Sequence, residues 1–488
     1  MPEITPATVS PARRWWLLAV LALAQLMIAL DTTIVTIALP SAQAELDFPD
    51  SLRQWIITGY ALTFGSLLLL SGRLGDRWGR KRTLIAGLAG FAVASAIGGA
   101  APSVALLIAA RIAQGAFAAL LAPSALALVS VLFSDSKERG RAFGIFGAVS
   151  MVGTTIGLLL GGALTEALSW RWTMYINTVI AIPAVLGALL LLPRVAERVR
   201  QRLDIPGAVT VTAGFFALVL GTSQVETSGG TAPETLGYLV AAFVLLTAFM
   251  VIQTRTRAPL LPLRVILDRR RGSALIALLL SSAGLFTVFL FLPYYLQITL
   301  GFPQLLTGVA FLPVPVALVT SAVFIGPSLT RRFTARPIVP LGLAIGGAGA
   351  FLLVRLGTSA AYLTDLLPSL VLIGAGIGLV VSIATGSATA GVDPADAGAA
   401  AASVNAAQQI GGSVGVAVLS TIAGSTSATF LADHPGQEAA AAVHGYATAY
   451  AGVSLLFLAG ALLALLIHPK NEKRATTSRL SPVVSRPS

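Results

Sequence analysis

The sequence predicts an all-α polytopic membrane protein, and three features carry that prediction. Of the 488 residues, 56% are hydrophobic and only 11% are charged, whereas a soluble domain carries about a quarter charged residues. The apolar residues gather in long unbroken runs, and a bilayer core of about 30 Å needs about 20 of them in a helix. Strands of a membrane barrel would instead alternate over about 10 residues, so these continuous runs indicate helices.

Fourteen apolar runs are long enough to be membrane spans. In chain order they cover 15–39, 53–71, 83–101, 103–131, 142–165, 172–192, 206–223, 236–253, 273–300, 304–329, 337–357, 365–391, 401–425 and 446–467. The first run follows the basic pair Arg13 and Arg14, as in a secretory signal. It is too long for a signal, and no small-residue cleavage site follows before Asp31, so we expect it to remain as the first span.

The basic residues predict the orientation of these spans. With a cytoplasmic N-terminus, the 32 Lys and Arg residues fall on the cytoplasmic side except Arg53, Arg171 and Arg355, which fall outside, and Arg111, which lies within a span. Cytoplasmic loops of membrane proteins carry such an excess. We therefore expect an even number of spans with both termini cytoplasmic. The net charge of +12 then reflects topology and attraction to the anionic inner leaflet, and it does not indicate nucleic acid.

The spans suggest a 6+2+6 organisation. The segment after the second span, 72–82 (GRLGDRWGRKR), has a weak echo after the tenth span, 327–337 (PSLTRRFTARP). Two parallel halves around a midplane site are an architecture of secondary transporters. We predict an N-terminal six-helix half, a two-helix insert with cytoplasmic linkers, a C-terminal six-helix half and a disordered cytoplasmic tail, covering 1–192, 193–272, 273–470 and 471–488.

Several segments resemble signatures of one known family. The 72–82 segment resembles the loop signature of the major facilitator superfamily. The segment LDTTIVTIALP at 30–40 is similar to the first-helix signature of its 14-helix drug:proton antiporter branch, and RIAQG at 111–115 is similar to the fourth-helix signature. Further similarity lies in the fifth-span glycines, in 294–301 and in 405–412. The resemblance extends over roughly 13–470 and implies a major facilitator fold and proton-coupled drug export.

The sequence departs from this branch at three positions. The antiporter signature normally has proline where this chain has Leu158, which weakens the expectation of antiport. The second loop copy has Arg331 where the first has Asp76. Many relatives carry an arginine where this chain has Gln408, so a possible second charge is missing from the expected cavity.

Asp31 and Arg111 are the two charges placed within spans. An ionised carboxylate there costs about 2.5–3.5 kcal/mol on insertion scales, so it requires water, a partner or a proton. Both residues lie about 12 Å below the outer end of their spans at 1.5 Å per residue. We predict that they pair, and that protonation of Asp31 weakens the pair and couples proton movement to transport. A permanent structural ion pair is the alternative.

Polar residues within spans are the candidates for substrate contact. The predicted set is Gln25, Gln114, Asn177, Tyr294, Gln297, Asn405 and Gln408. Such side chains also tie helices together, at about 0.6 kcal/mol each, and the tyrosine could belong to the aromatic belt at the membrane interface. Both alternatives stay open at this point.

Two glycine-containing motifs complete the predicted site. The loop residues Gly72, Asp76, Arg77, Gly79 and Arg80 are expected to form a cytoplasmic gate, because a carboxylate among cations can exchange partners as the halves move; a plain topology anchor is the alternative. Gly153, Gly157, Gly161 and Gly162 form small-residue faces in the fifth span, which allow close helix packing. The resemblance assigns these glycines to the antiporter motif.

The predicted function is proton-coupled efflux of a drug or antibiotic by alternating access. A symporter or facilitator for a small metabolite is the second hypothesis, and a non-transporting receptor or membrane enzyme is the third. No cysteine is present, and no G-x-x-x-x-G-K-[ST] phosphate loop occurs. We therefore expect no enzyme activity, no metal and no cofactor beyond the proton motive force. The expected partners are the lipid bilayer, protons and a small lipophilic substrate, for a monomer in a bacterial plasma membrane.

Overall fold

The computed structural model of this protein describes residues 11–133, 136–192, 204–228, 231–256, 259–260, 268–330, 333, 335–390, 392 and 397–467. Within these ranges all regular structure is helical, as the sequence predicts. The expected disordered tail, 471–488, lies outside the described residues, as does most of the two charged linkers.

Six long helices form the N-terminal half. They are α1 (Pro11–Leu46), α2 (Asp50–Trp78), α3 (Arg80–Gly99), α4 (Val104–Leu132), α5 (Ser136–Ala167) and α6 (Trp172–Leu191). The chain passes from α1 to α2 at one end of the bundle, where Asp47 has a positive φ of 47°. It passes from α2 to α3 at the other end, through Gly79 with a φ of 94°, which glycine adopts without a steric penalty. We call these ends the Asp47 end and the Gly79 end.

Two helices follow and then a second half with more interruptions. The insert consists of α7 (Ile205–Ser228) and α8 (Pro233–Arg255). The second half begins with α10 (Arg269–Tyr294), which continues into η2 (Tyr295–Thr299), and with a divided helix made of α11 (Gln304–Phe311), α12 (Pro313–Thr320), η3 (Ser321–Ile325) and α13 (Gly326–Thr330). It ends with α14 (Ala335–Leu353), η4 (Tyr362–Leu366) leading into α15 (Leu367–Thr389), α16 (Ala397–Asp433) and α17 (Glu438–Ile467). The expected tenth span is divided near Pro313 and Pro315, because proline lacks the N–H that continues a helix.

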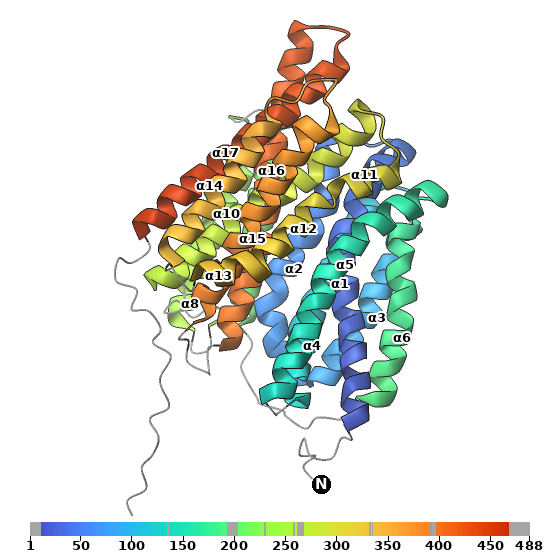
Figure 1. Ribbon diagram of the computed structural model, residues 1–488, viewed down its shortest axis with the longest axis vertical. Coiled ribbons are helices and arrows are strands. Elements are labelled where there is room, and N and C mark those ends of the chain that lie inside the picture. Colours follow the sequence, from blue (N-terminus) through green and yellow to red (C-terminus); the bar gives the residue numbers. More distant parts are fainter. Residues whose placement is uncertain are drawn as a thin grey trace, which may run out of the picture.

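The two halves repeat one packing pattern. In the first half α1 packs on α4, α5 and α6, and in the second half α10 packs on α15, α16 and α17. The pairs of α3 with α4 and α6 correspond in the same way to those of α14 with α15 and α17. Figure 1 shows the halves side by side, with α11–α13 running obliquely from beside α5 across the second half. This correspondence agrees with two copies of one six-helix unit; the domain boundaries themselves stay predictions.

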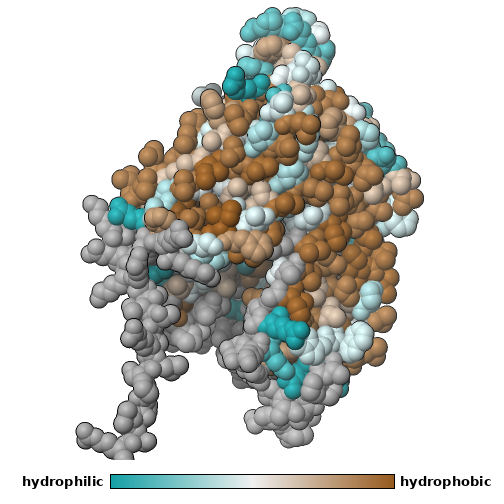
Figure 2. All heavy atoms as spheres, in the orientation of Figure 1, coloured by the Kyte–Doolittle hydropathy of each residue, from teal (hydrophilic) through white to brown (hydrophobic). Residues whose placement is uncertain are grey.

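The surface of the bundle suits lipid. Thirteen helical stretches in the described residues are long and apolar enough to cross a membrane, and α2 is not among them. Large apolar side chains face outward along the flanks, including Leu190, Phe243 and Leu466, and Figure 2 shows apolar side chains covering most of the visible flank. A soluble protein rarely exposes so large a contiguous apolar surface to water, so this surface indicates contact with lipid.

The insert packs where the two halves meet. α7 contacts both α2 and α16, and α8 packs on α7. Asp204 joins the two insert helices: its Oδ1 accepts the Gly207 N–H at 2.9 Å, and its Oδ2 accepts Gln253 Nε2 at 2.7 Å. Because this carboxylate is buried and hydrogen-bonded on both oxygens, it holds the start of α7 against the end of α8.

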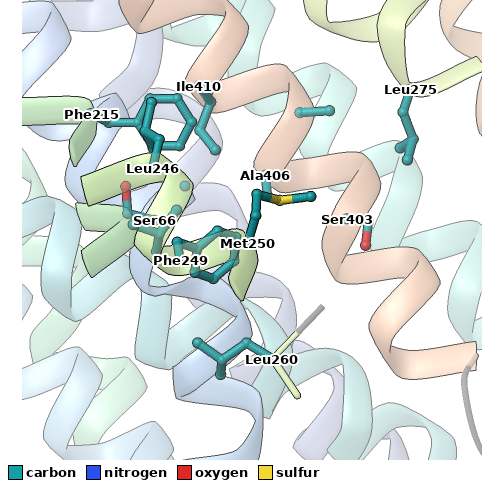
Figure 3. Close-up of a pocket in the computed structure, with 13 residues that line it drawn as sticks. Ser66, Phe215, Leu246, Phe249, Met250, Leu260, Leu275, Ser403, Ala406 and Ile410 are labelled. Carbon is teal, nitrogen blue, oxygen red and sulfur yellow. The ribbon is translucent and has the colours of Figure 1, made fainter. Parts of the chain in front are cut away.

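An apolar pocket of about 250 Å³ lies between the insert, α2, α10 and α16. Figure 3 shows side chains of the insert, among them Phe215 and Phe249, facing Ala406 and Ile410 of α16. The pocket is smaller than the roughly 300–1,000 Å³ of drug-sized ligand sites. It therefore has room for extra methyl groups rather than for a whole antibiotic.

This pocket predicts opposite effects for two small-to-large substitutions. Ala407→Leu adds atoms into the pocket and is expected to keep or raise the thermal unfolding temperature in detergent, because filling a void restores packing contacts. Gly65 lines the same pocket, but a Cβ at this position would lie 2.7 Å from Gln409 Cβ. Gly65→Leu should therefore lower the free energy of unfolding by about 1–3 kcal/mol. Equal losses for the two variants would contradict this assignment.

Candidate functional site

Asp31 on α1 and Arg111 on α4 form an ion pair inside the N-terminal half. Arg111 Nη1 lies 2.6 Å from Asp31 Oδ2, and the two side chains are 2% and 0% exposed. The prediction that these two charges meet is therefore confirmed. A pair so deeply buried is held only if the remaining polar atoms also find partners, because the desolvation of both charges is costly.

Those partners come from neighbouring helices. Asp31 Oδ1 accepts a hydrogen bond from Asn177 Nδ2 on α6 at 2.7 Å and from Gln114 Nε2 on α4 at 3.3 Å. Gln114 Nε2 also donates to Ser95 Oγ on α3 at 2.6 Å. Both carboxylate oxygens are thus hydrogen-bonded, which offsets part of the cost of burying them.

Arg111 is held by more than its carboxylate partner. Its Nε donates to the Ile56 carbonyl on α2 at 3.0 Å, and its Nη1 donates to Gln114 Oε1 at 2.9 Å. The Tyr60 ring on α2 lies 4.4 Å from the guanidinium carbon, within cation–π range. Five helices of the N-terminal half therefore converge on this ion pair, and three contacts of Arg111 are made with groups other than Asp31.

Two buried polar atoms beside the pair have no hydrogen-bond partner among the described residues. They are Asn177 Oδ1 and the Tyr60 hydroxyl. Buried polar groups are normally paired, so these atoms are places where a proton on Asp31, or a water, would find an acceptor or donor.

The polar residues predicted to contact substrate fall in several places. Gln114 and Asn177 are fully buried in the ion-pair network. Gln25 Nε2 donates to Ser150 Oγ at 2.7 Å and ties α1 to α5. Asn405 is exposed and bonds its own helix at Ala401, and Gln408 is half-buried on the same helix. The substrate role of these residues stays a prediction.

Tyr294 and Gln297 lie apart from the others, at the Asp47 end where the halves touch. The Tyr294 hydroxyl donates to Gln43 Oε1 at 2.6 Å, and Gln297 Nε2 donates to the Ile37 carbonyl at 2.9 Å. Both acceptors belong to α1. These two residues therefore lie at the contact between the halves, and their predicted role in substrate binding stays a prediction.

The predicted gate loop is a tight turn at the Gly79 end. Arg77 is exposed and Gly72 lies within α2. Arg80 Nη1 reaches the Ala127 carbonyl in α4 at 3.4 Å, and Lys81 Nζ reaches the Leu189 carbonyl in α6 at 3.0 Å. Cations near the last carbonyls of a helix are favourable, so these contacts anchor α3. The Asp76 side chain lies outside the described part of the chain, and the gate role stays a prediction.

The glycines of α5 serve two different contacts. A Cβ at Gly157 would lie 2.3 Å from Thr33 Oγ1 and 2.8 Å from the Leu30 carbonyl of α1. Gly153 and Gly161 face α1 in the same way. Gly162 instead faces α11 in the other half, where a Cβ at Gly162 would lie 2.4 Å from the Gln304 carbonyl oxygen. These glycines therefore pack α5 against α1 beside Asp31 and also bring the two halves together.

Three participants in the ion-pair network were not expected from the sequence. Ser95, Tyr60 and the Ile56 carbonyl come from helices whose rotation about their own axes is set by packing. A serine or tyrosine in an apolar span carries no signal of its partner, and a backbone carbonyl carries none at all. The argument from depth that paired Asp31 with Arg111 does not extend to these groups. It gives the depth of a residue along its span but not the direction in which its side chain faces.

Comparisons with known proteins agree with this geometry. The family model described as "Major Facilitator Superfamily" matches residues 21–416. The chain is 45% identical over 500 residues to "Puromycin resistance protein pur8" of Streptomyces alboniger, covering 100% of this chain and 99% of that protein. It is 39% identical over 378 residues to "Cephamycin export protein CmcT" of Amycolatopsis lactamdurans, covering 77% and 78%. It is 32% identical to "Multidrug efflux pump LfrA" of Mycolicibacterium smegmatis, covering 81% and 78%.

A solved structure supports the fold alone. A bacterial homologue of the human lysosomal transporter Spinster, in an inward-facing and occupied conformation, superposes with a TM-score of 0.63 at 15% sequence identity, covering 94% of this chain and 97% of that chain.

Proposed function

Because this chain belongs to the Major Facilitator Superfamily, we propose that it exports antibiotics or other small lipophilic compounds in exchange for protons. The chain is a transporter and not an enzyme, and it is a multi-pass protein of a bacterial plasma membrane. The observation that carries the proposal is the buried Asp31–Arg111 pair, in a chain that aligns along its whole length with a resistance protein.

The ion pair supports a mechanism for proton coupling. A proton that enters from the outer side neutralises Asp31, and the contact with Arg111 loses the attraction between two opposite charges. Arg111 then depends on Ile56, Gln114 and the Tyr60 ring. Because these partners lie on α2 and α4 while Asp31 lies on α1, neutralisation loosens α1 from the rest of its half. Release of the proton toward the cytoplasm restores the pair.

The topology is proposed to be fourteen spans with both termini cytoplasmic. α2 is the fourteenth span, since its 29 residues run beside α4 and α16. The Gly79 end then faces the cytoplasm, where basic residues accumulate, and the Asp47 end faces outward. In this proposal the units 1–192 and 273–470 rock against each other as a monomer, with 193–272 as the insert.

The substrate class follows from the charges near the pair. Asp31 is the one acid in the network among the residues that the structure describes, and Arg111 already neutralises it. A doubly charged cation would need more carboxylates at this depth. We therefore propose neutral, zwitterionic or singly charged lipophilic substrates.

Everted membrane vesicles provide the test. With the lumen acidified by respiration, puromycin, lincomycin and a panel of lipophilic cations would each be added outside while luminal pH is followed. One proton moving down 100 mV supplies about 2.3 kcal/mol, so a transported compound should release protons and accumulate in the lumen. Proton release that requires the compound to start in the lumen would instead identify a symporter, and the absence of any response to the panel would contradict drug export.

A further inference from the structure

Arg53 is a charged residue that the coupling mechanism does not use, and it is almost completely buried. It lies in the first turn of α2 at the Asp47 end, and it is 6% exposed. The sequence predicts it only as one of three arginines in outside segments. A buried guanidinium requires several partners, so its surroundings show what the burial achieves.

The partners of Arg53 lie on both halves of the molecule. Within its own half, its Nη1 lies 3.2 Å from Asp50 Oδ2. From the other half, the rings of Phe291 and Tyr294 on α10 lie 5.3 and 4.6 Å from the guanidinium carbon. Tyr446 on α17 packs against the Phe291 ring, with the ring centroids 5.5 Å apart. One charged side chain of the N-terminal half therefore lies against two aromatic rings of the C-terminal half, and a third ring packs on one of these two.

The neighbouring contacts close a ring around Arg53. Asp50 Oδ1 accepts Gln43 Nε2 at 2.7 Å, and Gln43 Oε1 accepts the Tyr294 hydroxyl at 2.6 Å. Arg53, Asp50, Gln43 and Tyr294 thus hold one another in a cycle, which we call the Arg53 clamp. Charge-assisted bonds and desolvated cation–π contacts are among the stronger polar interactions.

Other contacts between the halves at this end include one with a charged acceptor, in which Glu166 Oε2 accepts the Leu305 N–H at 2.9 Å, and two between neutral side chains. The Ser420 hydroxyl donates to Gln54 Oε1, and Gln304 Nε2 donates to Ser41 Oγ at 3.4 Å. These neutral bonds lie beside the clamp, along the same contact between the two halves at the Asp47 end, which we call the seam. The clamp is the part of the seam in which a full charge of one half is desolvated by aromatic rings of the other.

We propose that the Arg53 clamp is the latch that closes the Asp47 end of the transporter and sets how often that end opens. Opening requires Arg53 to leave Phe291 and Tyr294 together, because both belong to the opposite half. This role rests on the proposed alternating access, but it makes a prediction that needs neither substrate nor protons: the seam should open more often when the clamp is removed.

The absence of cysteine from the natural chain permits a direct test. Ser41→Cys places a single thiol in the seam beside Gln304, and its labelling rate with a membrane-impermeant maleimide reports seam opening. Adding Arg53→Ala should raise that rate by about tenfold or more, the shift expected from losing desolvated cation–π contacts. Arg53→Lys keeps the charge without the planar fork and should give an intermediate rate.

Arg171→Ala is the matched control. Arg171 also lies at the Asp47 end, contacts Glu45 at 2.9 Å and lies 4.6 Å from the Trp170 ring, but these partners belong to its own half. Its removal should leave Ser41→Cys labelling unchanged. An equal rise in both variants would mean general loosening, and no rise with Arg53→Ala in a protein that elutes normally from a gel-filtration column would overturn the clamp.

The test separates this inference from the proposed function. Labelling is measured in intact cells and in everted vesicles, so the side on which the thiol reacts reports orientation independently of Arg53. If the clamp variant labels faster while no compound moves protons, then the latch stands and the transport proposal fails. If compounds move protons while the labelling rate of the clamp variant is unchanged, then the transport proposal stands and the latch proposal fails.

Discussion

Asp31→Asn is expected to abolish substrate-driven proton release in everted vesicles while leaving the protein folded. Asparagine keeps the shape of the side chain but carries no titratable proton, so the exchange loses its coupling group. Removal of one partner from a buried ion pair costs about 3–5 kcal/mol. The contacts of Arg111 to Ile56, Gln114 and Tyr60 should offset part of that loss.

Two further variants distinguish coupling from structure. Asp31→Asn combined with Arg111→Gln removes both charges, and it should recover much of the lost stability without recovering proton release, as a double-mutant cycle would measure. Asp204→Asn changes another buried carboxylate, one that holds the insert, and it should retain coupling. If Asp31→Asn kept full proton release, the pair would be a structural ion pair and the coupling proposal would be wrong.

Gly157→Ala is expected to lower both stability and transport although the change adds a single methyl group. In an open helical position this substitution stabilises by about 0.5–1 kcal/mol. At Gly157 the new Cβ would lie 2.3 Å from Thr33 Oγ1 and 2.8 Å from the Leu30 carbonyl. The backbone of α1 must therefore move, at a cost of about 1–3 kcal/mol, and the two residues that move flank Asp31.

Gly147→Ala in the same helix is the matched comparison. A Cβ at Gly147 would meet no atom within 4 Å, so this variant should unfold at the same or a higher temperature than the natural protein and should transport normally. The measurements are thermal unfolding in detergent and the vesicle assay. Similar behaviour of the two alanine variants would show that α5 does not press on α1 in the working transporter.

The sequence determined much of the architecture because a membrane span can be recognised from a short, continuous stretch of residues. A run of about 20 apolar residues between basic loops predicts a helix at a known depth. The thirteen apolar helices of the structure lie where the runs predict them. Depth also paired Asp31 with Arg111, since both lie at a similar height on spans of opposite direction. The family resemblance added the two-half fold and the direction of transport.

Rotation and lateral position were decided only by the tertiary structure. Depth along a span does not say which way a side chain faces, so Gln114 and Asn177 looked equivalent to Tyr294 and Gln297 from the sequence. Packing turned the first two toward Asp31 and the last two toward α1 across the seam. Arg53 followed the same logic: its aromatic neighbours are distant in sequence, and only the meeting of the two halves brings Phe291 and Tyr294 against its charge.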